Sequence, residues 1–149
     1  MDRKYALSGI LLIAISGLAL GYLAPYKGKP QEVTFEQLSA SPDRYRGKSI
    51  VIEGFYFQGW ETIVLCEELG PSGFAEGHLV PKGEAIWVEG GIPRDVFEAL
   101  HRQEMMGPEE RFGKIRVQGR YEHGGEYGHL GGSSSQIIPS EVEMLQWSP

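Results

Sequence analysis

Two segments of this 149-residue chain alternate apolar and polar residues with the period of a β-strand. The clearer segment is 113–122, in which every second residue is apolar or glycine: Ile115, Val117, Gly119 and Tyr121. Residues 49–57 repeat the pattern, with Gly54 among the inward positions. Residues with this period lie together on one face only when the segment is a β-strand, so the chain must contain a sheet with one buried face. Glycine, at 21 positions, is about twice as frequent as usual and favours the tight turns between strands.

Short apolar runs bounded by turn residues predict three further strands. We expect them at 62–66, 85–89 and 136–147, and Pro139 is a potential break in the last one. Polar stretches rich in glycine separate these runs and predict two long loops, at residues 67–83 and 123–135.

Two helices complete the prediction. Thr34, followed three residues later by Gln37, is typical of a capping box and predicts a short helix ahead of the first strand. Pro93 suits the first turn of a second helix of about eleven residues, which includes His101 and ends before Gly107. The order of strands, with this helix between the third and fourth, resembles the oligonucleotide/oligosaccharide-binding (OB) fold, a five-stranded Greek-key barrel. The fold class expected for 32–149 is therefore mainly β, and another small α+β domain is the alternative.

The segment Tyr5–Ala24 contains no charged residue and follows two cationic ones. As a helix it is about 30 Å long, enough to cross the core of a bilayer. The cationic start stays in the cytoplasm, which places the barrel outside it. We expect a transmembrane signal anchor over 1–24, a linker over 25–31 and a single-pass protein of the inner membrane. A cleaved signal peptide, with Ala19 and Gly21 before the cut, is the alternative and predicts a secreted or periplasmic domain.

Charge is distributed unevenly along the chain. Residues 1–30 carry a net charge of +3, so the total of −6 leaves −9 on residues 31–149. Because phosphate backbones are bound through clusters of cations, an acidic domain of this size argues against a nucleic-acid partner.

Ligands of OB folds usually lie between the loop after the first strand and the loop before the last. In this chain those loops are 57–60, with two aromatic rings, and 123–135, with a glycine-rich backbone; the third strand adds an indole. The predicted binding residues are Phe57, Trp60, Trp87, Tyr127 and His129. We expect them to bind a small molecule, a glycan or a protein. The alternative is that the rings cover the ends of a small core.

A second hypothesis makes the protein a metal or haem carrier. His123, Glu126 and His129 lie within seven residues, and imidazole with carboxylate suits Zn, Ni, Cu or Fe; His78 is a potential fourth ligand. His123 and Tyr127 also match the motif His-x-x-x-Tyr, in which the chain resembles the haem chaperone of cytochrome c maturation. That resemblance implies haem attachment at His123 and axial ligation by Tyr127.

No set of residues indicates an enzyme. Cys66 lies in an apolar run and precedes Glu67 and Glu68, which we expect to raise the pKa of its thiol and make it a poor nucleophile. The serines at 133–135 lack a Gly-x-Ser-x-Gly elbow, and the sequence contains no phosphate-binding loop or dinucleotide motif. The first hypothesis is therefore a binding module that needs no cofactor.

Two short motifs flank the predicted barrel. Pro42, Tyr45 and Gly47-Lys48 form Pro-x-x-Tyr-x-Gly-Lys before the first strand, and residues 128–131 form Gly-His-Leu-Gly before the last. In these motifs, residues 33–146 resemble a group of small bacterial exported or membrane-anchored OB-like proteins, mostly of unknown function. The resemblance implies the fold and the location and leaves the ligand open.

Overall fold

The structure is a computed structural model that describes residues 28–104 and 107–149. The predicted anchor at 1–24, and residues 25–27 of the predicted linker, lie outside the described residues. Within the described part of the chain, no helix is both long and apolar enough to cross a membrane.

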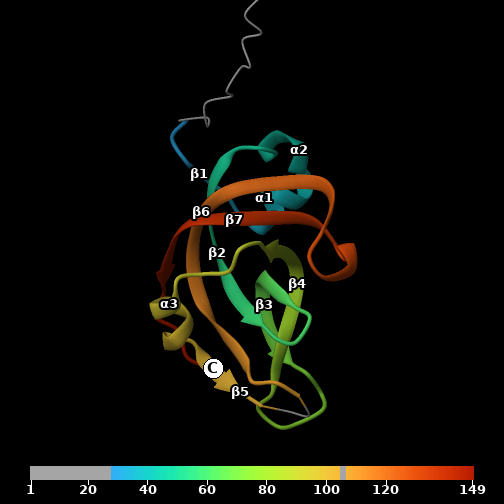
Figure 1. Ribbon diagram of the computed structural model, residues 1–149, viewed down its shortest axis with the longest axis vertical. Coiled ribbons are helices and arrows are strands. Elements are labelled where there is room, and N and C mark those ends of the chain that lie inside the picture. The colour runs from blue at the N-terminus through green and yellow to red at the C-terminus, as the bar shows by residue number, and fades with distance from the viewer. Residues whose placement is uncertain (1–27, 105–106) are drawn as a thin grey trace, which may run out of the picture.

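The described residues form seven strands, three α-helices and one 3-10 turn (Figure 1). The strands are β1 (Gln31–Glu32), β2 (Ser49–Gln58), β3 (Ile63–Pro71), β4 (Leu79–Val88), β5 (His101–Gln103), β6 (Glu110–Tyr127) and β7 (Ser133–Met144). The helices are α1 (Phe35–Ala40), α2 (Pro42–Tyr45) and α3 (Arg94–Ala99), and the 3-10 turn is η1 (His129–Gly131).

One sheet in the order β1-β2-β3-β4-β7-β6-β5 closes on itself, because β2 also pairs with β6. The closed part is a five-stranded barrel of β2, β3, β4, β7 and β6, and β1 and β5 are added at its flanks. Its strands pair antiparallel except β4 and β7, which are parallel. The prediction of a mainly β barrel with a helix between its third and fourth strands is confirmed, and the order is consistent with an OB-like barrel.

Side chains from every barrel strand fill the interior. Those with almost no exposed surface are Ile50, Ile52, Tyr56, Leu65, Val88, Ile115, Val117, Tyr121 and Ile137. Two inward positions are glycines that approach a neighbouring strand closely: a Cβ atom on Gly54 would lie 2.8 Å from the carbonyl oxygen of Cys66, and one on Gly119 would overlap that of Ile138. The strongly curved wall therefore requires glycine at both places.

Helix α1 covers one end of this core with the buried side chains of Phe35 and Leu38. Its first turn has the predicted capping box: the Gln37 amide donates to Thr34 Oγ1 over 3.2 Å, and the Thr34 amide donates to Gln37 Oε1 over 3.0 Å. The prediction of a short helix at this point is confirmed. A second short helix, α2, follows directly and begins at Pro42.

Both predicted long loops are wrong, because most of their residues belong to paired strands. β3 continues to Pro71 and β4 already begins at Leu79, so 72–78 alone connects them. Most side chains of this outer hairpin are exposed or half-buried on both faces, so its sequence shows no alternation of apolar and polar residues. Hydrogen bonds between the two backbones hold the strands together. Likewise β6 extends to Tyr127 and β7 begins at Ser133.

The predicted eleven-residue helix is also too long. α3 ends at Ala99, because Leu100 takes an extended conformation with φ −65° and ψ 153°. His101 then lies in β5, where it pairs with Phe112 of β6. The apolar spacing that suggested a longer helix arises because Leu100 is buried and His101 stacks on Phe112.

Candidate ligand-binding groove

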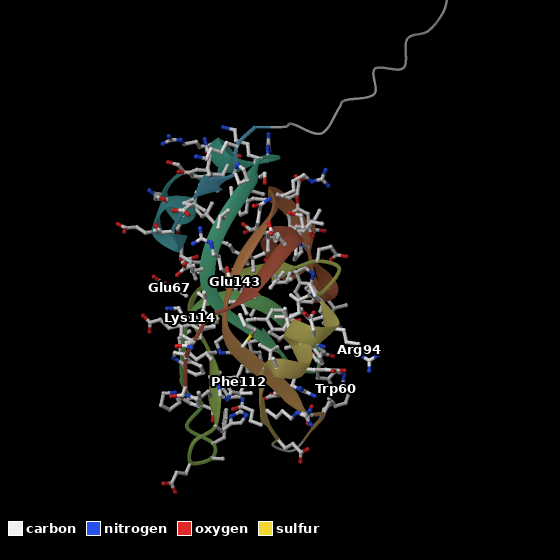
Figure 2. The ribbon with its side chains drawn as sticks, turned by 90° about the vertical axis from the view of Figure 1, so that its left-hand side faces the viewer. Trp60, Glu67, Arg94, Phe112, Lys114 and Glu143 are labelled. Atoms are coloured by element: carbon white, nitrogen blue, oxygen red, sulfur yellow. The ribbon has the colours of Figure 1, made fainter. Side chains whose placement is uncertain are left out.

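A tight turn after β2 carries the most exposed indole of the described chain. The Gly59 amide donates to the Thr62 carbonyl oxygen over 2.8 Å, which closes the turn and leaves Trp60 at its tip. Trp60 is 77% exposed. Figure 2 shows it on the opposite side of the barrel from Lys114 and Glu143.

The turn between β6 and β7 has a backbone that only certain residues adopt. Gly128 has φ 73° and ψ −163°, a region open to glycine alone, and Leu130 has a positive φ of 52°. A Cβ atom on Gly128 would lie 2.5 Å from two atoms of the Trp87 ring. The backbone of this turn therefore rests directly on the indole of Trp87, and glycine is required at position 128 for two independent reasons.

The two turns meet at a shallow groove on the barrel surface. Glu61, next to Trp60, lies 3.4 Å from Nε2 of His129 and bridges the turns. The groove has a volume of about 320 Å³. It is lined by Trp60, Glu61, Ile63, Trp87, Glu89, Gly128 and His129, and we call it the Trp60 groove.

The Trp60 groove combines aromatic walls with negative charge. Nε1 of Trp87 donates a hydrogen bond to Glu89 over 3.0 Å, which fixes the indole against the strand. Glu61 and Glu89 both line the groove, and none of the described residues that line it is lysine or arginine. Exposed indole faces beside carboxylates attract cations and groups that stack on flat rings.

Three of the five predicted binding residues, Trp60, Trp87 and His129, come together in this groove. Phe57 does not join them: it is only 4% exposed and pairs with Phe112 across β2 and β6. Tyr127 lies in β6, where its ring packs against Gly125 of the same hairpin, and it does not line the groove.

The residues of the metal and haem hypothesis have other partners. His123 stacks on Tyr121, and its Nδ1 lies 2.9 Å from Ser135 Oγ. Glu126 packs against Gly131, and His129 pairs with Glu61.

His78 lies in the β3–β4 hairpin, where its Nε2 is 2.8 Å from Glu110. Glu110 is the first residue of β6, and the same carboxylate accepts a hydrogen bond from Gln103 of β5, so His78 attaches the hairpin to β6 and, through Glu110, to β5. Across residues 28–104 and 107–149, no three His, Cys, Asp or Glu side chains are grouped to hold a metal ion. The carrier hypothesis therefore gains no ligand set from the described residues.

Cys66 is buried in the barrel wall, and burial raises the pKa of its thiol to about 11. The direction agrees with the sequence-based prediction, but its expected cause is wrong. Desolvation raises the pKa, whereas hydrogen bonds with the backbone, including that of Glu68, lower it.

Sequence reasoning missed four residues of the groove: Glu61, Ile63, Glu89 and Gly128. Glu89 is two residues after Trp87 and so lies on the same face of an extended segment, which is a usable signal. The contact between Gly128 and Trp87 carries no such signal, because it depends on the parallel pairing of β4 with β7.

Comparisons with protein-family models, with curated proteins and with solved structures found no match to this chain.

Proposed function

We propose that the protein is a membrane-anchored, extracytoplasmic OB-like module that binds its ligand in the Trp60 groove. The strand order of the barrel supports the OB-like assignment. The groove lies between the turn after the first barrel strand and the turn before the last, which is where ligands of OB folds usually lie. The uncharged segment at residues 5–24, preceded by two cations, supports the anchor and the outward orientation.

The observation that carries the proposal is the exposed Trp60 beside a second indole. Burial of an indole is strongly favourable, so a tryptophan that remains 77% exposed is available to a partner. Tryptophan is also among the residues that most often dominate binding energy. Trp87, held by Glu89 and covered on its ring by Gly128, gives the groove a fixed wall.

A panel of probes on the full-length chain in a neutral polyoxyethylene detergent tests this function. Calorimetry is run with a cello-oligosaccharide, a chito-oligosaccharide and short peptides with a cationic or an anionic side chain. We expect saturable binding of at least one probe, weakened by Trp60→Ala and unchanged by Phe74→Ala. Phe74 is a matched control, because it is 82% exposed on the β3–β4 turn. Binding that is equal in both variants, or no binding of any probe, contradicts the proposal.

The location is tested separately with reporters fused to the carboxyl end. Alkaline phosphatase is active only where its disulfides form, outside the bacterial cytoplasm. We expect phosphatase activity in the membrane fraction. An inactive fusion contradicts the orientation, and an active fusion in the soluble periplasmic fraction contradicts the anchor.

A further inference from the structure

The Trp60 groove and a larger hollow on the barrel are both lined by carboxylates, but among the described residues only the larger hollow is also lined by lysine and arginine. The hollow, which we call the Arg116 groove, has a volume of about 670 Å³ and lies between α1 and the outer face of β2 and β6. Arg116 binds Glu53 over 2.9 Å and also binds Glu32, so these two carboxylates already have a cationic partner. The pKa of Arg116 is raised by these two partners.

In the Trp60 groove, by contrast, no lysine or arginine among the described residues lines the surface. Glu61 contacts His129 and Glu89 accepts from Trp87, and neither carboxylate pairs with a lysine or arginine of the described chain. The whole segment 31–149 carries a net charge of −9. Charge complementarity therefore points to a cationic ligand.

The shape of the surface indicates that this cation belongs to a macromolecule. The groove is shallow and open, whereas sites for small molecules are usually clefts that enclose most of the ligand surface. Leu130, next to His129, is 92% exposed and held outward at a positive φ. An apolar side chain beside a cationic groove ligand would contact Leu130, as in the interfaces of protein partners.

We propose that the Trp60 groove binds an arginine side chain presented by an exposed segment of a partner protein, an inference that rests on the proposed function. A guanidinium is planar and weakly hydrated, so it stacks on an indole while its N–H groups donate to carboxylates. In this groove the indoles are those of Trp60 and Trp87, and the acceptors are Glu61 and Glu89. Leu130 supports an apolar neighbour of the arginine.

The test uses the acetylated and amidated peptide Gly-Leu-Arg-Leu-Gly with the full-length chain in the same detergent. Two matched peptides replace the arginine with citrulline, its neutral isostere, or with lysine. We expect citrulline to weaken binding by about tenfold or more, because it removes the charge and retains the shape. Lysine should weaken it by about threefold, because its ammonium does not stack flat.

Variants of the protein locate the site. Trp60→Ala should weaken binding of the arginine peptide by about tenfold, and Glu61→Gln and Glu89→Gln by about threefold to tenfold each. Glu89→Gln keeps an acceptor for Trp87, so its effect reports the charge. Glu76→Gln, in the exposed β3–β4 turn, is the charge-matched control and should change nothing.

The outcomes separate this inference from the function on which it rests. If an oligosaccharide binds in a Trp60-dependent manner and the arginine peptide does not, the inference is overturned and the binding function stands. Equal affinity for the arginine and citrulline peptides also overturns the inference. If no probe depends on Trp60, both fail.

Discussion

The protein holds its tryptophans in two different ways, in the Trp60 groove and in a packed cluster at the carboxyl end of the chain. In the cluster, the Trp147 ring meets Phe55 at 5.0 Å, His101 at 5.6 Å and Phe112 at 6.2 Å, each edge to face. We call these four residues the Trp147 cluster. In the Trp60 groove, Trp60 is exposed and carboxylates lie beside it.

The difference separates rings that stabilise the fold from rings that remain available. Edge-to-face pairs contribute beyond their buried area, so the Trp147 cluster should hold the final residues against the barrel. Trp60 has no comparable burial, so its replacement should lower the stability of the fold only slightly and should weaken ligand binding strongly. The predictions below test this division of roles.

The largest change expected is loss of the Trp147 cluster together with the barrel at alkaline pH. Burial raises the pKa of Tyr56 from 10.0 to about 12 and that of Cys66 from 9.0 to about 11. Both groups are neutral at a pH below the pKa that each has in the unfolded chain, so their contribution to stability is complete there. It is lost as pH rises through the pKa values of the folded state, about 11 for Cys66 and about 12 for Tyr56. Cys66 pairs with Phe55, which contacts Trp147, so the cluster should report this loss.

Urea unfolding followed by tryptophan fluorescence between pH 8 and pH 12 measures the effect, with the pH range set by the two shifts above. Cys66→Ala should remove the part of the loss that begins near pH 9, the ordinary pKa of a thiol. A stability that is unchanged up to pH 12 contradicts the account.

The next largest effect separates Trp147 from Trp60. Trp147→Ala should lower the free energy of unfolding by about 3 kcal/mol, because it removes three ring contacts, and should leave peptide binding unchanged. Trp60→Ala should change stability by less than about 0.5 kcal/mol and abolish most binding. Urea denaturation and calorimetry of both variants measure the two effects. A Trp60→Ala variant as unstable as Trp147→Ala would show that Trp60 belongs to the fold.

The fold and part of the groove could be predicted because their signals are local. Thr34 and Gln37 cap α1 within one turn, and Gly54 and Gly119 stand at inward strand positions that the alternation identifies. Trp60 is predictable as a ring in the turn after the first barrel strand.

The remainder depends on contacts between segments that are distant in the sequence. The outer β3–β4 hairpin has no apolar period because most of its side chains meet solvent. The burial of Phe57 could not be predicted, since it follows from the pairing of β2 with β6. The sequence predicted a helix at His101 because its apolar neighbours have helical spacing, whereas His101 lies in a strand that pairs with β6.

A substitution at Gly128 tests how far the groove depends on the turn that rests on Trp87. Gly128→Ala should lower stability by about 2 kcal/mol, through backbone strain and contact with the indole, and should weaken peptide binding. Gly90→Ala is the matched control, because its φ of 79° is similar and no atom lies within 4 Å of an added Cβ. That variant should lose about 1 kcal/mol and retain binding. If the two variants bind equally, the contact with Trp87 does not shape the groove.

The smallest effect is expected at the Arg116 groove. Arg116→Gln frees Glu32 and Glu53, but the residues that line this hollow include no tryptophan. We expect calorimetry to show unchanged affinity for the arginine peptide and a stoichiometry of one. A second binding event of similar affinity would show that free carboxylates suffice, and that the indoles of the Trp60 groove are not needed.

The most direct test observes the three indole N–H groups of the chain by heteronuclear NMR while the arginine peptide is added. The account predicts that the resonances of Trp60 and Trp87, with the amide of Gly128, shift together and saturably while that of Trp147 stays in place. A shift of Trp147 alone, or spectra without any change at Trp60, would contradict it.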